Sequence, residues 1–175
     1  MHKRLFYIDP DFIVIRGEGT STEKETTVTD PAKNAPDHPR WRSGPTFNLT
    51  EAQTHVNVVA LTGGSVVLSD RIPKLSKKGL ELIYKVIDST EVPAKALDLG
   101  DNTLASIWYQ DVGHEKRLTV INWEDKDAVK SVSFLDEGIK IPEQLKDFWS
   151  GEKSSTKDGR LTIPLKAHES KVYTW

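Results

Sequence analysis

Apolar positions recur at helical spacing in the middle of the first half of the chain. They run from about residue 50 to residue 62 and stop at Gly63-Gly64, a pair that commonly ends a helix. Thr50 stands at the start with Gln53 three residues later, the spacing of a capping box. The pattern predicts a helix over about 50–62 with Thr50 as its N-cap. The apolar residues are Ala52, Val56, Val59 and Ala60.

A second helical pattern follows the short extended stretch SVVLSD. Ser76 precedes KKGLELIYKVI, in which Leu80, Ile83 and Ile87 share one face. Serine is a favoured N-cap residue, so we expect this helix to begin after Ser76 and to end near Asp88.

The N-terminal segment over residues 4–16 reads as extended chain, because RLFYI and FIVIR flank DPD. Pro10 cannot donate to a strand ladder, which places Asp9 and Asp11 at the rim of a strand. In extended chain the two carboxylates would share a face about 6.5–7 Å apart. Two interpretations stay open: a carboxylate pair that faces a ligand, or a turn that caps itself.

The second half changes to short strand-like segments separated by turn residues. This spacing is typical of an antiparallel β-sandwich, with GEKSSTKDG as an exposed hairpin loop. We therefore divide the chain into residues 1–90 and 91–175. The predicted strands are KALDL, LASIWYQ, RLTVINW, AVKSVSF, QLKDFW, RLTIPL and SKVYTW.

The composition argues against several classes of function. A formal net charge of -2 and 29% charged residues give no electrostatic footprint for nucleic acid or a membrane surface. The absence of cysteine excludes disulfides and thiolate sites. The histidines never fall at metal-ligand spacing, so we expect neither a metal nor a cofactor. We expect no signal peptide and no membrane span, and the compartment stays open.

The polar stretch over residues 17–46 contains the segment HPRWR. An indole such as that of Trp41 can stack on a sugar ring, and a guanidinium such as that of Arg42 can bind hydroxyls or carboxylates. The alternative is that Trp41 packs on the domain while Arg42 is solvated. His55, on the first predicted helix, is expected to pack rather than to act as a base.

Three segments, taken in order, resemble the C-terminal part of a melibiase-type α-galactosidase. They are RLFYIDPDFIVIRGE, the stretch from LTEAQTHVNVVALTGG through LSDRIPKLSKKGLELIYKVID, and the β-rich end LTIPLKAHESKVYTW. That family has a (β/α)8 barrel followed by an antiparallel β-sandwich. The resemblance implies an α+β fold here: the end of a barrel, with its last strand and two helices, and then the sandwich.

The resemblance also implies a site. The family carries an Asn-Asp-Pro-Asp motif on a barrel strand, and Asp9, Pro10 and Asp11 match it while Ile8 replaces the asparagine. Asp11 would then face the sugar pocket, with Phe12 beside it. The family's catalytic aspartates lie on earlier strands, so no residue of this chain receives a catalytic role and the chain alone is expected to be inactive.

Three functions stay open at this point. The chain is expected to be the C-terminal region of a glycoside hydrolase that contacts a galactoside or other carbohydrate. The alternatives are an autonomous carbohydrate-binding sandwich using its aromatic residues, and a scaffold domain. A barrel strand without its neighbours would have unpaired edges, so we also expect a homo-oligomer formed through the N-terminal strand.

Overall fold

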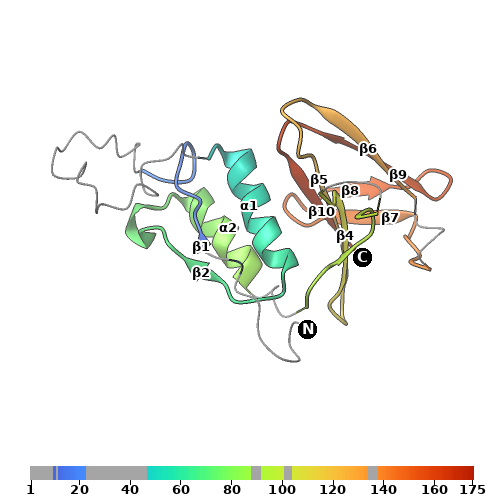
Figure 1. The fold of residues 1–175 in the computed structure, drawn as a ribbon, viewed down its shortest axis with the longest axis horizontal. Helices are drawn as coiled ribbons and strands as arrows, with labels where there is room; N and C mark the ends of the chain where they lie inside the picture. The colour runs from blue at the N-terminus through green and yellow to red at the C-terminus, as the bar shows by residue number, and fades with distance from the viewer. Residues whose placement is uncertain (1–9, 11, 23–46, 88–91, 101–103, 134–137) are drawn as a thin grey trace.

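The computed structural model describes residues 10, 12–22, 47–87, 92–100, 104–133 and 138–175. Its N-terminal part has the order β1 (Phe12–Ile13), α1 (Leu49–Leu61), β2 (Val67–Leu68), a 3-10 helix (Ile72–Lys74) and α2 (Lys77–Ile87). β1 and β2 are parallel, and parallel neighbours need a crossover connection. Helix α1 lies in that connection (Figure 1).

The expectation that the N-terminal strand would leave both edges unpaired is wrong. Phe12 pairs with Val67 and Ile13 with Leu68, so SVVLSD supplies a strand partner from the same chain. Of the predicted extended segment, β1 is the part that forms strand, and residues 4–9 and Asp11 lie outside the described residues.

The core of this N-terminal part lies between β1 and the two helices. Ile13 and Ile15 are fully buried there, at 0% exposure. The two residues come from the apolar run FIVI, and their burial is the main reason the short strand stays against the helices. The helical residues of the core are Ala52, Val56, Val59, Ala60, Leu82, Ile83 and Val86.

Helix α1 has the predicted extent within one residue but a different cap. Asn48, not Thr50, is the N-cap: its side chain accepts the Glu51 N–H at 3.0 Å, and the Glu51 carboxylate accepts the Asn48 N–H at 2.9 Å. This is a complete capping box. Thr50 therefore lies inside the first turn of the helix.

Helix α2 begins after Ser76, as predicted. The Ser76 hydroxyl donates to the Gly19 carbonyl at 2.8 Å and accepts the Gly79 N–H at 3.2 Å. Gly79 is needed where this turn meets the preceding loop, because a Cβ there would lie 2.3 Å from the Thr20 carbonyl oxygen.

The second half is all β, as the sequence predicts. Its strands form a six-stranded sheet of order β3-β4-β5-β10-β7-β8 and a two-stranded sheet of β6 and β9, all antiparallel. One strand was not predicted: β8 lies within the stretch GEKSSTKDG, which was expected to be a loop. The strands are β3 (Lys95–Ala96), β4 (Ile107–Asp111), β5 (Lys116–Ile121), β6 (Ala128–Ser133), β7 (Gln144–Asp147), β8 (Lys153–Ser155), β9 (Arg160–Leu165) and β10 (Ser170–Thr174).

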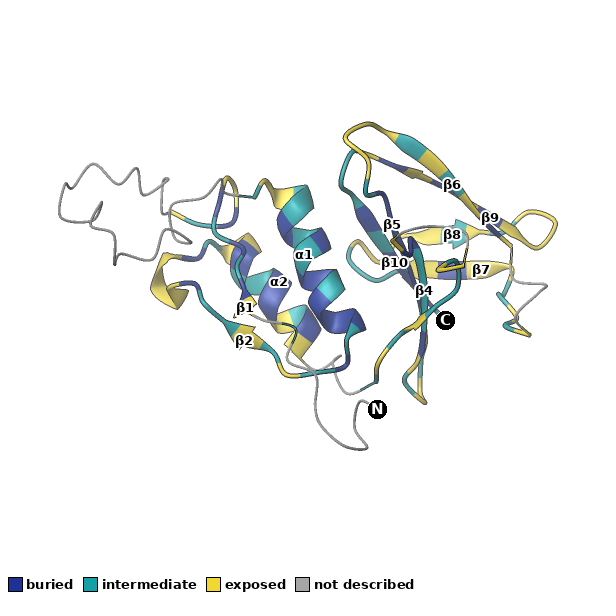
Figure 2. Cartoon of the chain, in the orientation of Figure 1, coloured by how far each residue is buried: buried dark blue, intermediate teal, exposed yellow. Residues whose placement is uncertain are grey.

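Near β5 and β10 both faces of the six-stranded sheet are buried, one against β6 and β9 and the other against α1. One face meets β6 and β9 across an apolar core that includes Leu118, Val120 and Tyr173. The alternate residues Thr119, Ile121 and Ser170 are buried as well, on the side of α1 (Figure 2). Helix α1 therefore has buried residues on most of its surface, which explains why polar Thr54 and Asn57 lie inside.

The contact between α1 and the sheet is made of hydrogen bonds. Asn57 Nδ2 donates to Ser170 Oγ at 2.7 Å, and Thr54 Oγ1 donates to the His168 carbonyl at 2.8 Å. Gln110 Nε2 donates to the Ala60 and Val92 carbonyls at 3.3 and 2.7 Å. These buried polar groups are all paired, so the two halves of the chain meet at defined positions.

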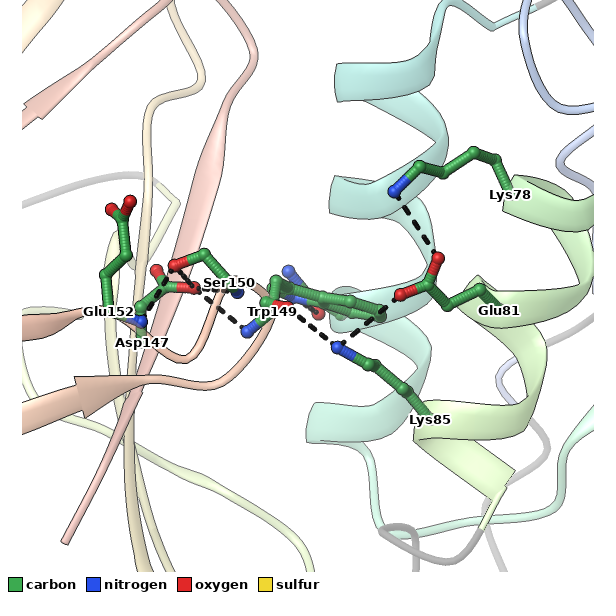
Figure 3. A network of polar contacts seen from close by, with 8 residues as sticks. Lys78, Glu81, Lys85, Asp147, Trp149, Ser150 and Glu152 are labelled. Atoms are coloured by element: carbon green, nitrogen blue, oxygen red, sulfur yellow. Dashed lines mark hydrogen bonds and ion pairs between the residues drawn. The ribbon is translucent and has the colours of Figure 1, made fainter.

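Trp149, in the turn between β7 and β8, extends this contact (Figure 3). Its indole Nε1 donates to Asn57 Oδ1 at 3.2 Å, while Lys85 Nζ of α2 donates to the Trp149 carbonyl at 2.7 Å and lies 3.8 Å from Glu81 Oε1. Lys85 Nζ is also 5.4 Å from the Trp149 ring, within the range of a cation–π contact. Both helices thus hold the same tryptophan.

Candidate functional site at strands β1 and β2

Phe12 is the predicted site residue that the structure describes. It lies on β1 opposite Val67, with 52% and 36% of these residues exposed, whereas the next residue, Ile13, is fully buried. Because side chains alternate along a strand, Phe12 and Val67 are on the face away from the helical core. The other predicted residues, Asp9, Asp11, Trp41 and Arg42, lie outside the described residues.

A carboxylate from the end of β2 holds the chain that follows β1. Asp70 Oδ2 accepts the Ile15 N–H at 2.6 Å, and Asp70 Oδ1 accepts a hydrogen bond from Arg16 Nη1 at 2.8 Å. The Ser69 N–H also donates to the Ile13 carbonyl, at 3.0 Å. The ends of the two strands are therefore fixed to each other beyond the short ladder.

The ion pair of Arg16 and Asp70 was not predicted from the sequence. A signal was present, because each charged residue directly follows an apolar extended run, FIVI and SVVLS. Parallel strands bring their C-terminal ends to the same edge, so opposite charges there are expected to meet. That inference required knowing that the two runs pair.

His55 supports β1 from α1. Its Nε2 accepts the Val14 N–H at 3.3 Å, and its ring lies 5.3 Å from the Phe47 ring. The same Nε2 also lies 3.4 Å from the Phe12 carbonyl oxygen. His55 thus packs on the backbone of β1.

Among the described residues at β1 and β2, no two side chains form an acid–base pair suited to catalysis. Both oxygens of Asp70 already accept hydrogen bonds, from the backbone and from Arg16, which suits an anchoring group. The two resolved pKa shifts concern tyrosines of the sandwich: burial is the largest cause that raises the pKa of Tyr109 and of Tyr173. No cluster of three or more metal-ligating side chains occurs among the described residues.

Neither helix in the described part of the chain is both long and apolar enough to cross a membrane.

Comparison with known proteins finds similarity in the structure only. No family model and no curated protein matches the sequence. Among solved structures, a Bacteroides fragilis protein assigned as an α-galactosidase or melibiase matches with a TM-score of 0.63 and 11% identity over 75% of this chain and 29% of its own. A variant of a β-L-arabinopyranosidase from Geobacillus stearothermophilus, solved with arabinose, matches with a TM-score of 0.60 and 18% identity over 75% of this chain and 32% of its own.

The α-galactosidase of Saccharomyces cerevisiae, solved with raffinose, matches with a TM-score of 0.55 and 11% identity over 74% of this chain and 44% of its own. The chain thus spans less than half the length of each of these three structures. The matches confirm, at the level of the fold, the resemblance seen in the sequence. The chain has the fold of part of an α-galactosidase-like glycoside hydrolase.

Proposed function

We propose that this chain is the C-terminal region of an α-galactosidase-like glycoside hydrolase, to which it contributes sugar-contact residues and a stabilising β-sandwich. The observation that supports this most is the element order. The chain has a parallel β-α-β-α unit followed by antiparallel sheets, and about three quarters of it matches glycoside hydrolase structures in fold. The unit corresponds to the end of a (β/α)8 barrel in the proposal.

The proposed sugar contacts are Phe12 on β1, Asp9 and Asp11 shortly before it in the sequence, and Trp41 and Arg42 from the sequence before α1. Carboxylates accept hydrogen bonds from sugar hydroxyls, and aromatic faces stack on the apolar face of a pyranose. The exposure of Phe12 on the face away from the helical core supports this side as the one turned to a ligand. The partner is a galactoside or a related carbohydrate.

We further propose that the 175 residues have no glycosidase activity alone, since the catalytic carboxylates of such an enzyme would belong to preceding barrel strands. Purified chain incubated with a chromogenic aryl α-galactoside is expected to release no chromophore above the buffer rate. Turnover that disappears in Asp9→Asn or Asp11→Asn would contradict the proposal, because it would make these residues catalytic. Sequencing the gene upstream of Met1 is a second test, and we expect it to encode further strand–helix units in the same reading frame.

The sugar contact itself is tested by titrating methyl α-galactoside into labelled protein and following the Phe12 backbone amide by NMR. We expect a saturable shift that weakens at least several-fold in Asp11→Asn. Asp158→Asn, at a turn of the sandwich, is the matched control and is expected to leave the shift unchanged. Equal effects of the two variants would remove Asp11 from the proposed contact.

A homo-oligomer through the N-terminal strand stays a prediction. Among the described strands, β1 pairs with β2. Light scattering at increasing protein concentration is expected to report a dimer or larger species. A monodisperse monomer over the whole range would contradict this expectation.

A further inference from the structure

A hollow of about 270 Å³ lies between the N-terminal half of α1 and two loops of the sandwich. None of the described residues that line it belongs to β1, although His55 also contacts the β1 backbone. The residues that line it are Phe47, Glu51, Thr54, His55, Val58, Trp123 and His168.

A buried asparagine holds the two loops in place. Asn122 is 0% exposed, and its Nδ2 donates to the Lys126 carbonyl and to the Lys166 carbonyl, each at 2.8 Å. The first loop carries Trp123 and the second carries His168. One side chain therefore fixes the spacing of the two loops, before any ligand binds.

The lining side chains are held individually as well. Trp123 Nε1 donates to the Ala105 carbonyl at 2.9 Å, which fixes the edge of the indole. His168 has a φ of 56°, which is unusual for a residue other than glycine. Its carbonyl accepts a hydrogen bond from Thr54 Oγ1, and His168 Nε2 lies 2.9 Å from Asp125 Oδ1. Glu51 is held by the capping box. Such preorganised polar groups around apolar surface are typical of small-molecule sites.

The chemistry of the lining points to a neutral ligand with hydroxyl groups. Phe47 and Trp123 offer aromatic surface, while Glu51 and the two imidazoles offer acceptors and donors near it. Of the described residues that line the hollow, none is lysine or arginine, so an anionic ligand would meet Glu51 without a compensating cation.

The size of the hollow sets the size of the ligand. Drug-sized sites usually measure roughly 300–1,000 Å³, and 270 Å³ is just below that range. One or two sugar rings fit this limit. We propose that the hollow is a second carbohydrate site, which binds a neutral pyranose unit by stacking on Trp123 and by hydrogen bonds to Glu51 and His55. A ligand of this size that leaves one face in solvent binds in the millimolar range.

The test follows the indole N–H signals by NMR while methyl α-galactoside, methyl α-glucoside, galactosamine and galacturonate are added separately. We expect the Trp123 signal to shift saturably with at least one of the two neutral glycosides. The structure offers a matched pair of variants, because Trp108 Nε1 also donates to the Ala105 carbonyl, at 3.0 Å, but does not line the hollow.

Trp123→Ala is expected to weaken binding at least about tenfold, while Trp108→Ala stays within about twofold of the parent. Glu51→Gln retains a side chain compatible with the capping box and is expected to bind severalfold more weakly. If Trp123→Ala fails to fold, Glu51→Gln decides the question, and an unchanged affinity overturns the proposal.

The proposal is also overturned if folded protein shows no saturable Trp123 shift up to about 100 mM glycoside, a concentration well above the expected range. Binding of galactosamine or galacturonate alone overturns it too, since the site would then select charge. The failure of this proposal is distinct from the failure of the proposed function. A shift at Phe12 without one at Trp123 supports the sugar contact at β1 and contradicts the second site. A shift at Trp123 without one at Phe12 supports the second site and contradicts the contact at β1.

Discussion

Asp70 and Arg16, separated by 54 positions in sequence, form an ion pair of 2.8 Å that closes the ends of the parallel strands β1 and β2. The Asp70 side chain is only 1% exposed, and the Arg16 side chain is 18% exposed. A two-residue ladder is marginal by itself. The pair, together with the Ile15 N–H bound to Asp70, is therefore a main reason why β1 stays beside β2.

Removing the Asp70 carboxylate is expected to destabilise the protein strongly. Asp70→Ala leaves the buried Ile15 N–H and the Arg16 guanidinium without their acceptor, and such losses cost about 2–4 kcal/mol. Urea unfolding measures this free energy. Glu81→Ala, which removes a solvent-accessible partner of Lys78 and Lys85 on α2, is the control and is expected to cost about 0.5 kcal/mol or less. Equal costs for the two variants would show that Asp70 does not anchor β1.

Gly79→Ala is expected to destabilise the protein although alanine favours helix. Alanine gains about 1 kcal/mol over glycine inside a helix, but its Cβ here would lie 2.3 Å from the Thr20 carbonyl oxygen, a backbone atom that cannot move alone. Overpacking of this kind costs about 1–3 kcal/mol, and a contact with backbone belongs at the upper end. We expect a net loss of about 1–2 kcal/mol in thermal or urea unfolding.

Gly100→Ala is the matched control for this substitution. Apart from Gly100 and its two chain neighbours, no heavy atom of the described residues lies within 4 Å of the Cβ that would be added at Gly100. Its free energy of unfolding is expected to change by less than about 0.5 kcal/mol. A stable Gly79→Ala variant would contradict the close contact between α2 and the loop that contains Thr20.

Local patterns predicted the features that depend on neighbouring residues. Ser76 was predicted as a cap because the apolar period starts directly after it, and its hydroxyl does accept the Gly79 N–H. The start of α1 was harder, since Asn48 with Glu51 and Thr50 with Gln53 are both spaced as capping boxes. A bridge between Gly17 and Phe47 decides between them, because it fixes the chain as far as residue 47 and lets the helix begin at Leu49.

Features that depend on distant residues were missed. Strand β8 has the exposed, polar sequence KSS, so no apolar alternation marks it, and its strand form follows from pairing with β7. The ion pair of Arg16 and Asp70 required the β1–β2 pairing, which no local rule contains. Of the predicted site, Phe12 is exposed, and the roles of all five residues, Asp9, Asp11, Phe12, Trp41 and Arg42, stay predictions.

Asn57→Ala is expected to weaken the contact between α1 and the sandwich. Asn57 accepts from Trp149 Nε1 at 3.2 Å and donates to Ser170 Oγ at 2.7 Å, and it is 3% exposed. The change removes the acceptor of the half-buried Trp149 Nε1 and one of the two hydrogen bonds of Ser170 Oγ, which keeps Thr54 Oγ1 at 2.9 Å, at a cost of about 1–3 kcal/mol. Tryptophan fluorescence and far-ultraviolet circular dichroism during urea unfolding are expected to give separate midpoints in the variant.

Gln53→Ala is the control for Asn57→Ala, because Gln53 lies on the same helix and is only partly buried. It is expected to keep coincident midpoints and to change the free energy of unfolding by less than about 0.5 kcal/mol. Coincident midpoints in Asn57→Ala as well would show that the two halves unfold together without this hydrogen bond.

Tyr173→Phe is expected to reduce the loss of stability at alkaline pH. Burial in the sandwich core raises the pKa of Tyr173 above 10.0; a hydrogen bond with Ser154 opposes the shift, and the charges of Asp147 and Glu169 add to it. Because the folded state disfavours the phenolate, this residue's contribution to stability is present below about pH 10 and is lost as the pH rises through the raised pKa. The free energy of unfolding should therefore fall more between about pH 9 and about pH 11 in the parent than in Tyr173→Phe, as measured by urea unfolding. Tyr84→Phe removes an exposed hydroxyl from α2 and should reproduce the parent's fall; if Tyr173→Phe reproduces it too, the buried phenol is not responsible for the alkaline loss.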